Sequence, residues 1–541
     1  MLCKERFERW AEKSINPSHV LDALTKLEIV EIVLTKGEDD PQVIFESINS
    51  TGLELSNADL IRNYLLMNAD DQEKLYENYW LYIEKTLRNK MDYSNLDAFF
   101  MQYIVYKTSK PVNSRQLYNS FVKLFKDSGY SQENILKELR YYAEIFGAFV
   151  YGSDRYSDRI NKLLYRLRVL NQTTCYPFLL HVFDDYHQGV ITEETVEKIL
   201  QFILAYLLRR MVCGVPSNTL RGLFTYLYNR IFKVASNKQK YYETLNKFLF
   251  TVSSKDVIPS AAEFERALQK ANIYGNNALC RFLLLDIENG DGKEILQAEN
   301  LTIEHIMPQT LSADWSHIRP EEHEEYLHTL GNLSVTGYNS ELSNKSFAEK
   351  RDIIRENSKA VILNSDVLDK ESWNVADIQA RAKRLAGIVL ARYKIERILD
   401  DSIEFEYIET LTLDNYDEVT GKKLVSFELF GETYRQNKYA LMLLDVIKLL
   451  DKKSPGKLQT LAENNYSFNS TKRKHVHLNL DGSGMRWPWK VTDGIYLEAN
   501  LSAWSCIRFI ENLLAEFGFE KDQFSFNIVA EEPSETDEDE E

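Results

Sequence analysis

The chain has 541 residues, which is too long for one hydrophobic core and predicts about three domains. Its 44% hydrophobic and 12% aromatic content is typical of well-packed globular proteins and argues against a disordered chain. The longest apolar run, near Phe202–Leu208, is far too short to span a membrane, and residues 1–6 do not open a signal peptide. We therefore expect a soluble, cytoplasmic protein.

The formal net charge of −17 argues at first sight against a nucleic-acid partner, because phosphate binding needs local positive charge. Eight of the negative charges lie in residues 531–541, which we expect to be a disordered, solubilising tail, and −9 is left for the rest. An acidic protein can still bind phosphates through a few basic residues, so the total does not decide the question. The cysteines are far apart and form no C-x-x-C pair, which argues against a disulfide framework or a zinc knuckle: Cys3, Cys175, Cys213, Cys280 and Cys506.

The first 70 residues contain one apolar run and one clear helix start. Residues 27–34 alternate in part and predict a strand or a buried element. Asn49–Gly52 is a turn signal, and Ser56 with Asp59 forms a capping box that opens an apolar helix. Turn and cap chemistry explains these residue types as well as a direct functional role would.

From about residue 70 to 290 the chain predicts one helix after another. The clearest helix covers Thr192–Arg210, where apolar residues recur with helical spacing over several turns. Arg209 and Arg210 stand at its carboxyl end, where cations complement the helix dipole. We therefore favour a structural role for this pair over nucleic-acid binding.

Residues 301–350 combine two short strands with a polar helix start. The first strand ends at Glu304-His305, and Pro308 prevents it from continuing. The second strand covers Asn332–Thr336, and an Asn-rich segment leads into the next helix. A purely structural strand that ends at proline, followed by a Gly-Asn turn and a capped helix, would use many of the same residue types. A functional site is therefore indicated only by the order of the whole set: Glu-His at the end of one strand, Gly-Asn-Leu at the start of the next, and asparagines at the following helix.

Hydrolysis of a phosphodiester needs a base for water and a cation for the developing charge. His305 suits the base, because a neutral imidazole accepts a proton near neutral pH. Glu304 offers a hard oxygen ligand for Mg²⁺ or Mn²⁺. The amide of Asn332 is placed to orient the His305 ring, and Asn339 and Asn344 are neutral oxygen ligands on the following helix.

Basic and histidine side chains around this stretch have two interpretations each. Lys345 and Lys350 are near enough in sequence to reach phosphates. Zinc ligation would use histidines of the connection between the strands, but their irregular spacing favours solvated loop residues: His317, His323 and His328.

An acidic connection near 400–420 leads to a smaller α/β unit. Its predicted strands are Leu424–Phe430, Thr433–Arg435, Gly494–Glu498 and Phe524–Val529, with helices near Lys438–Leu450 and Ser502–Phe517. Between them, Arg473, Lys474 and Trp487 belong to a basic and aromatic stretch that can grip a phosphate backbone or stack on a base. A charged hairpin with tryptophan packed beneath it fits the same letters.

The ordered motifs IEHIMPQ and LHTLGNLSVTGYNSELSNKSFAEKR closely resemble the HNH-type (His-Me finger) nuclease domain at the C-terminal end of GmrSD-like type IV restriction endonucleases. The resemblance implies that His305 is the general base, that Glu304 binds the metal and that Asn332 supports the site. It implies Asn339 as the helix metal ligand, with Asn344 as the alternative. It also implies DNA as the substrate and defence against phages, especially those whose DNA carries modified bases.

The stretch IFESINSTGLELSNADLIRNYLL resembles the later part of the ParB-like N-terminal domain of the same family. The family's D-G-Q-Q-R nucleotide motif does not occur in this sequence, so we expect no nucleotide on this chain alone. Either the reading frame is truncated, or a separate chain supplies the nucleotide-binding half. The alternative function is a non-catalytic or truncated subunit that binds DNA or a partner in a two-part restriction system.

The predicted fold is mainly α and multidomain. A helical N-terminal region precedes a ββα-metal (HNH-type) nuclease core embedded in helices, and a small α/β domain follows. The expected boundaries are 1–75 for the ParB-like remnant, 76–259 for a helical linker domain, 260–398 for the nuclease domain, 399–422 for a linker, 423–530 for the α/β domain and 531–541 for the tail.

Overall fold

The computed structural model describes residues 17–28, 55–67, 69, 71–88, 94–232, 235–251, 258–290, 296, 301–337, 342–403, 408–416, 419–468 and 476–529. The chain forms two compact units, Met1–Gln72 and Glu73–Glu541. The described part is mainly helical with small sheets, as the sequence predicts. None of the described helices is long and apolar enough to cross a membrane.

The N-terminal unit contains the described helices α2 (Pro17–Leu24) and α4 (Asn57–Met67). Ser56 caps α4 as its sequence predicts: its hydroxyl accepts from the Asp59 N–H at 3.1 Å and donates to the Asp59 carboxylate at 2.8 Å. The strand predicted for 27–34 falls almost wholly outside the described residues, as does the Asn49–Gly52 turn.

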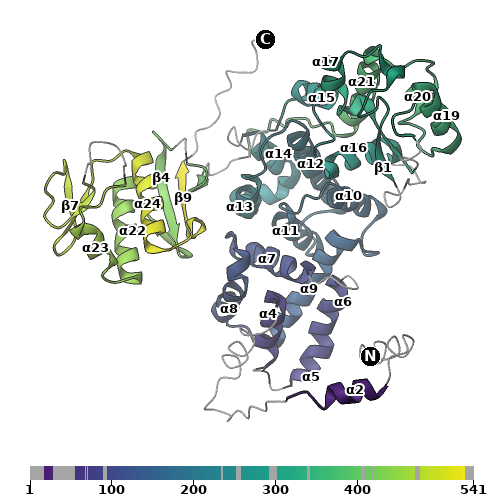
Figure 1. Cartoon of the computed structure of the whole chain (residues 1–541). Coiled ribbons are helices and arrows are strands. Elements are labelled where there is room, and N and C mark those ends of the chain that lie inside the picture. The colour runs from purple at the N-terminus through teal and green to yellow at the C-terminus, as the bar shows by residue number, and fades with distance from the viewer. Residues whose placement is uncertain are drawn as a thin grey trace. The chain divides into compact units, whose positions relative to one another are not determined.

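The second unit begins with a long helical region, labelled from α5 to α14 in Figure 1. Its elements are α5 (Gln72–Leu75), a π-helical turn (Tyr76–Trp80), α6 (Leu81–Leu87), α7 (Ser94–Thr108), α8 (Leu117–Ser128), α9 (Gln132–Tyr151), α10 (Asp158–Val169), α11 (Tyr176–His187), α12 (Glu193–Val212), α13 (Leu220–Phe232) and α14 (Tyr241–Thr251), with 3₁₀ turns at Ser114–Gln116 and Ala235–Lys240. Leu, Phe and Tyr side chains fill the space between these helices.

Helix α12 confirms the clearest sequence prediction. Thr192 caps it through the N–H of Thr195 at 3.3 Å, and most of its apolar residues are fully buried. Arg209 and Arg210 are buried rather than solvated. Arg209 donates to the carbonyl groups of Pro259 and Tyr393, and Arg210 donates to that of Pro216, so each guanidinium group bonds to backbone oxygens.

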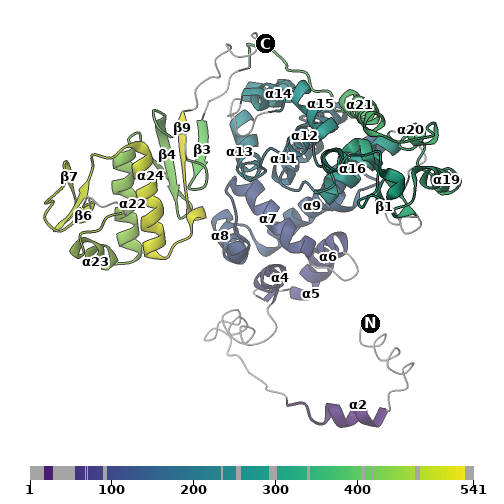
Figure 2. The same ribbon diagram turned by 45° about the horizontal axis from the view of Figure 1, so that its top comes forward.

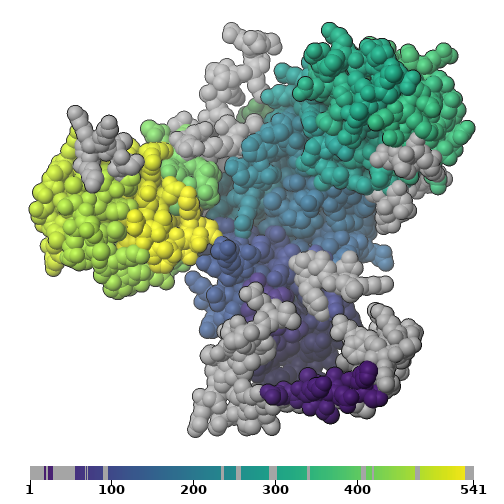
Figure 3. Space-filling view, viewed as in Figure 1, coloured from purple at the N-terminus to yellow at the C-terminus, as the bar shows by residue number. Residues whose placement is uncertain are grey.

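The next segment carries the two predicted strands inside a cover of helices. Its elements are α15 (Ala261–Lys270), α16 (Asn277–Asn289), β1 (Thr302–His305), α17 (Pro320–Tyr326), β2 (Leu333–Thr336), α19 (Phe347–Asn357), α20 (Ser365–Leu368) and α21 (Val375–Arg392), with 3₁₀ turns at Ala313–Trp315 and Leu330–Asn332. In the space-filling view these residues pack into one continuous body, coloured teal to green (Figure 3). One apolar cluster beneath β1 and α19 includes Ile306, Met307, Trp315, Phe347 and Trp373.

The C-terminal part is an α/β domain whose helices separate two sheets. The larger sheet has the order β3-β9-β4-β5 and the smaller one β6-β8-β7, and the described neighbours are antiparallel. Figure 2 shows α22 and α24 side by side on one face of the larger sheet, with the smaller sheet beyond them. The elements are β3 (Ile408–Thr412), β4 (Lys423–Leu429), β5 (Glu432–Arg435), α22 (Tyr439–Lys453), α23 (Lys457–Glu463), β6 (Leu478–Asn479), β7 (Pro488–Thr492), β8 (Ile495–Glu498), α24 (Ala503–Phe517) and β9 (Phe524–Val529), with a 3₁₀ turn at Lys521–Gln523.

Most predicted strands of this domain are found within a residue of their expected bounds, and one prediction fails. Residues 408–412 were expected in a linker, but they form β3 and pair with β9. The strand was missed because its partner stands more than a hundred residues later in the chain.

Candidate active site

Strands β1 and β2 bring the two halves of the predicted motif together. They pair antiparallel, with Glu304 opposite Ser334 and His305 opposite Leu333. One more backbone bond, from the Ile306 N–H to the Asn332 carbonyl at 2.9 Å, closes the ladder before Pro308. The pair ends there because proline has no N–H to donate. Glu304 and His305 therefore stand at the end of the ladder.

The His305 ring is buried among other polar and aromatic side chains, with 4% of the residue exposed. Its Nε2 lies 3.1 Å from Nδ1 of His328, and its Nδ1 lies 3.3 Å from Nε2 of Gln309. The Tyr274 ring packs edge-on against it, with 4.6 Å between the ring centres. Burial is the main cause that lowers the pKa of His305 to about 3, and the neighbouring positive charge of Lys350 also lowers it. The ring is neutral at pH 7.

Asn332 supports the backbone beside His305, and its side chain bonds to main-chain groups instead of the imidazole. Its amide oxygen accepts from the Met307 N–H at 2.7 Å, and its amide nitrogen donates to the carbonyl groups of Met307 and Leu327, each at 2.9 Å. All of its polar atoms are thus used on the main chain, and the residue is fully buried. Asn332 was predicted to contact the His305 ring directly; in the structure it bonds to the backbone of the residues that follow His305.

Glu304 and Lys350 form a buried ion pair. The Lys350 ammonium lies 2.7 Å from Oε1 of Glu304 and donates a second bond, also 2.7 Å, to the His305 carbonyl. Burial raises the pKa of Glu304 and lowers the pKa of Lys350, and for each group this outweighs the attraction of its partner. Lys350 was predicted to reach phosphates. It is instead fully buried on α19, where it fixes the end of β1.

The remaining predicted ligands differ in what can be said of them. Asn339 lies outside the described residues. Asn344 was expected on a helix, but it lies in an exposed turn before α19, which begins at Phe347 after the Ser346 cap. Lys345 follows in the same turn and is exposed, while its carbonyl accepts from the Trp315 indole at 3.0 Å. The turn is therefore anchored, and its two polar side chains face solvent.

The three histidines of the connection were expected to be solvated: His317 is exposed, His323 and His328 are half-buried, and each has a hydrogen-bond partner in the protein. Nε2 of His317 donates to the Trp373 carbonyl, and Nε2 of His323 donates to the Pro308 carbonyl, each at 2.9 Å. His328 contacts His305 directly, as described above. The role of His328 was missed because its partner stands 23 residues earlier, and only its place four residues before Asn332 could have suggested it.

Helix α21 closes the back of β2. Gly331 lies so near this helix that a Cβ atom would be 2.2 Å from the Ile378 carbonyl oxygen. The fully buried Arg381 donates to the carbonyl groups of Leu330, Gly331 and Leu363. These contacts fix the 3₁₀ turn that carries Asn332.

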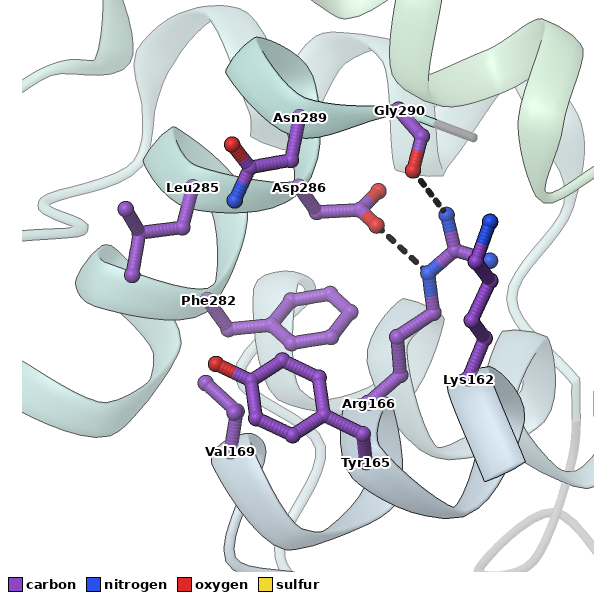
Figure 4. Close-up of a pocket in the computed structure, with 9 residues that line it drawn as sticks. All are labelled: Lys162, Tyr165, Arg166, Val169, Phe282, Leu285, Asp286, Asn289 and Gly290. Atoms are coloured by element: carbon purple, nitrogen blue, oxygen red, sulfur yellow. Dashed lines mark hydrogen bonds and ion pairs between the residues drawn. The ribbon is translucent and has the colours of Figure 1, made fainter. Parts of the chain in front are cut away.

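The Asp286 carboxylate connects this segment to the helical region. Asp286 of α16 accepts from Arg166 of α10 at 2.7 Å, from Arg392 of α21 at 2.7 Å and from the hydroxyl of Tyr393 at 2.9 Å. Figure 4 shows Arg166 reaching both Asp286 and the Gly290 carbonyl beside a small pocket lined by Tyr165 and Phe282. Because cations and a hydroxyl surround Asp286, its oxygens are used in structure.

The nucleic-acid contacts predicted for the C-terminal domain are described in part. Arg473 and Lys474 lie outside the described residues. Trp487 is 63% exposed, so it is not packed beneath a hairpin. Its backbone N–H donates to the buried Glu498 carboxylate at 3.0 Å. The same carboxylate accepts from the backbone N–H groups of Arg486 and, at 2.8 Å, Asn500. The domain therefore presents an aromatic ring to solvent on a fixed backbone.

The side chains at this site offer few ligands, so they suit only a metal ion that keeps most of its bound water. Across the described ranges, no group of three or more His, Cys, Asp or Glu side chains could hold an ion. The site supplies one hard carboxylate, Glu304, whose Oε1 accepts a hydrogen bond from Lys350. Mg²⁺ accepts such a set, because it keeps several waters and takes further oxygens from phosphate.

Comparison with known families assigns the class of this segment. Residues 258–388 match the family described as GmrSD restriction endonucleases, C-terminal domain. The class that the match indicates for this segment is a restriction endonuclease domain. This segment of the chain is therefore similar to the C-terminal domain of GmrSD restriction endonucleases, the family that its motifs predict. No curated protein matches the chain.

Proposed function

We propose that this protein is an HNH-type, metal-dependent DNA endonuclease of type IV restriction, and that His305 is its general base. The supporting observation is the placement of His305 and Glu304 at the end of β1, within the segment that matches the GmrSD C-terminal domain. The proposed biological role is defence against phages, with modified foreign DNA as the target.

In this mechanism neutral His305 accepts a proton from the attacking water. A base with so low a pKa is present in its unprotonated form at any physiological pH. It is also a weak proton acceptor, so it needs close alignment and a water that is already acidified. A bound Mg²⁺ or Mn²⁺ would supply that acidification and would neutralise charge on the phosphate.

The proposed metal ligands are Glu304 and one asparagine, either Asn339 or Asn344. Glu304 can share its carboxylate between the metal and Lys350, because the two oxygens offer about four lone-pair sites. Lys350 then has a positioning role: it holds the Glu304 carboxylate and the His305 carbonyl with one ammonium group.

The proposed DNA contacts come from exposed groups. Lys345 stands next to Asn344 in the turn before α19, where its charge can meet a phosphate. Trp487 can stack on an unpaired or modified base, and Arg473 and Lys474 belong to the same basic stretch of sequence. We propose no nucleotide site on this chain alone, and a second chain that carries one would act in trans.

The decisive test is cleavage of glucosylated, methylated and plain DNA by the full-length protein with Mg²⁺ or Mn²⁺. We expect cleavage of at least one DNA by the wild type and none by His305→Ala. Exposed Lys359→Met is the matched control and should cleave like the wild type. Protein from a neighbouring gene that carries a nucleotide motif is added in parallel. If no combination cleaves and His305→Ala restricts phage as well as the wild type, the proposal is wrong.

The competing function is a non-catalytic subunit that binds DNA or a partner. The pairing of Glu304 with Lys350 favours it, since the carboxylate is already neutralised without a metal. This function predicts metal-independent DNA binding that is unchanged in His305→Ala and Glu304→Gln.

A further inference from the structure

Both ring nitrogens of His305 face a side chain, and the two sides differ in exposure. Nε2 faces inward to Nδ1 of His328, and Nδ1 faces Gln309, which is exposed. A neutral imidazole has one donor and one acceptor nitrogen, so the identity of these neighbours determines which nitrogen carries the proton.

Counting donors assigns the tautomer. The Gln309 amide nitrogen can only donate, so Nδ1 of His305 must be the acceptor. The proton of His305 then lies on Nε2 and is donated to Nδ1 of His328. His328 must in turn carry its own proton on Nε2. A His305 protonated on both nitrogens would place two donors against each other at Gln309.

The protein holds His328 in the orientation that this arrangement needs. Its carbonyl accepts from the Ile273 N–H at 3.0 Å. Its ring lies parallel to that of Tyr274, with 5.1 Å between centres and 8° between planes. Tyr274 also packs edge-on against His305, so one tyrosine fixes the relative placement of both imidazoles.

We infer that His328 is the positioning residue of the proposed base: it accepts the Nε2–H of His305 and so directs the lone pair of Nδ1 outward, to the place where the attacking water binds. This inference rests on the proposed function. The exposed Gln309 occupies that place in the structure, and the inference requires its side chain to move away when water and substrate bind.

In the proposed step, one O–H bond of the water breaks and its proton goes to Nδ1. The water oxygen forms a bond to phosphorus while the bond from phosphorus to the leaving oxygen breaks. A solvent proton neutralises the leaving oxygen. His328 does not touch the reacting atoms; it stabilises the resulting imidazolium by continuing to accept from Nε2.

The test uses full-length protein labelled with ¹⁵N-histidine and compares two substitutions of His328. His328→Phe keeps a ring against Tyr274 but cannot accept a hydrogen bond, whereas His328→Asn keeps an acceptor oxygen. Histidine ¹⁵N spectra at pH 7.5 report the tautomer of His305, whose signals are identified by their loss in His305→Ala. His317→Phe is the control, because His317 bonds to the Trp373 carbonyl instead.

We expect His305 to carry its proton on Nε2 in the wild type, in His317→Phe and in His328→Asn, and to lose this preference in His328→Phe. In cleavage assays kcat should fall about tenfold to hundredfold in His328→Phe with little change in KM, and His328→Asn should recover much of it. A proton on Nδ1 in the wild type, or an unchanged tautomer in His328→Phe, would overturn the inference. If the tautomer behaves as expected but no variant or wild type cuts DNA, the hydrogen-bond assignment stands and the proposed function fails.

Discussion

Replacing Lys350 by methionine would leave the Glu304 carboxylate buried without its cation. In the folded protein Glu304 would then take up a proton, and at pH 7.5 this costs about 4 kcal/mol for a group with an ordinary pKa near 4.5. That cost is the upper limit of the destabilisation caused by the carboxylate, because Glu304 takes up a proton whenever staying charged would cost more free energy. It agrees with the ~3–5 kcal/mol expected when one partner of a buried pair is removed.

The proton cost makes the prediction depend on pH. At pH 6.0 the same protonation costs about 2 kcal/mol, so the penalty of Lys350→Met should shrink by about half. Hydrogen exchange of the β1 and β2 amides measures this opening free energy locally in the full chain. Glu304→Gln combined with Lys350→Met should remove the pH dependence. The exposed Lys359→Met should change the free energy by less than about 0.5 kcal/mol. A penalty below about 1 kcal/mol at pH 7.5, or one that does not change with pH, would refute the reasoning.

Three further predictions concern packing and burial. Gly331→Ala should unfold the segment around β2, seen as loss of soluble protein or of exchange protection, because its Cβ would overlap the Ile378 carbonyl; Gly387→Ala, with open space around it, should stabilise α21 by about 0.5–1 kcal/mol. Asn332→Ala should cost at least about 3 kcal/mol in the same exchange measurement, since three backbone groups, two of them in buried hydrogen bonds, lose their partner. Burial holds the pKa of His181 at about 3, so protons bind the unfolded state first and the helical region should lose about 2 kcal/mol between pH 7.5 and 5, a loss that is absent in His181→Phe and is read by exchange in α11.

Local chemistry explains the parts of the fold that were predicted well. The Ser56 and Thr192 caps mark true helix starts, because a cap is made by residues three apart. Proline after His305 ends β1 for a reason that is visible in the sequence. The family's motifs are local in the same sense, and the match at residues 258–388 confirms the family resemblance that they indicate.

The detailed contacts of the site depend on packing between distant segments, which a single sequence does not show. Lys350 has the right charge for phosphate, yet 46 residues separate it from the carboxylate it neutralises. Asn332 has an amide that could orient the His305 ring, but this amide bonds to backbone atoms of Met307 and Leu327 instead. The sequence shows His328 only as a residue of a loop, whereas in the structure its ring packs on Tyr274, which also contacts His305. In each case the residue type indicated the kind of contact that the side chain can make, but the sequence did not show which group it contacts.

The carboxylate of Asp286 sets a limit on how the nuclease can be isolated. Its three charged or hydroxyl partners are Arg166, Arg392 and Tyr393, and all of them lie beyond the 258–388 segment that defines the family. A fragment trimmed to the family boundaries would bury an anion that has lost every one of them. A fragment that folds independently and keeps this carboxylate paired must therefore extend from α10 through Tyr393, so the helices before β1 and β2 belong to it as much as the two strands do.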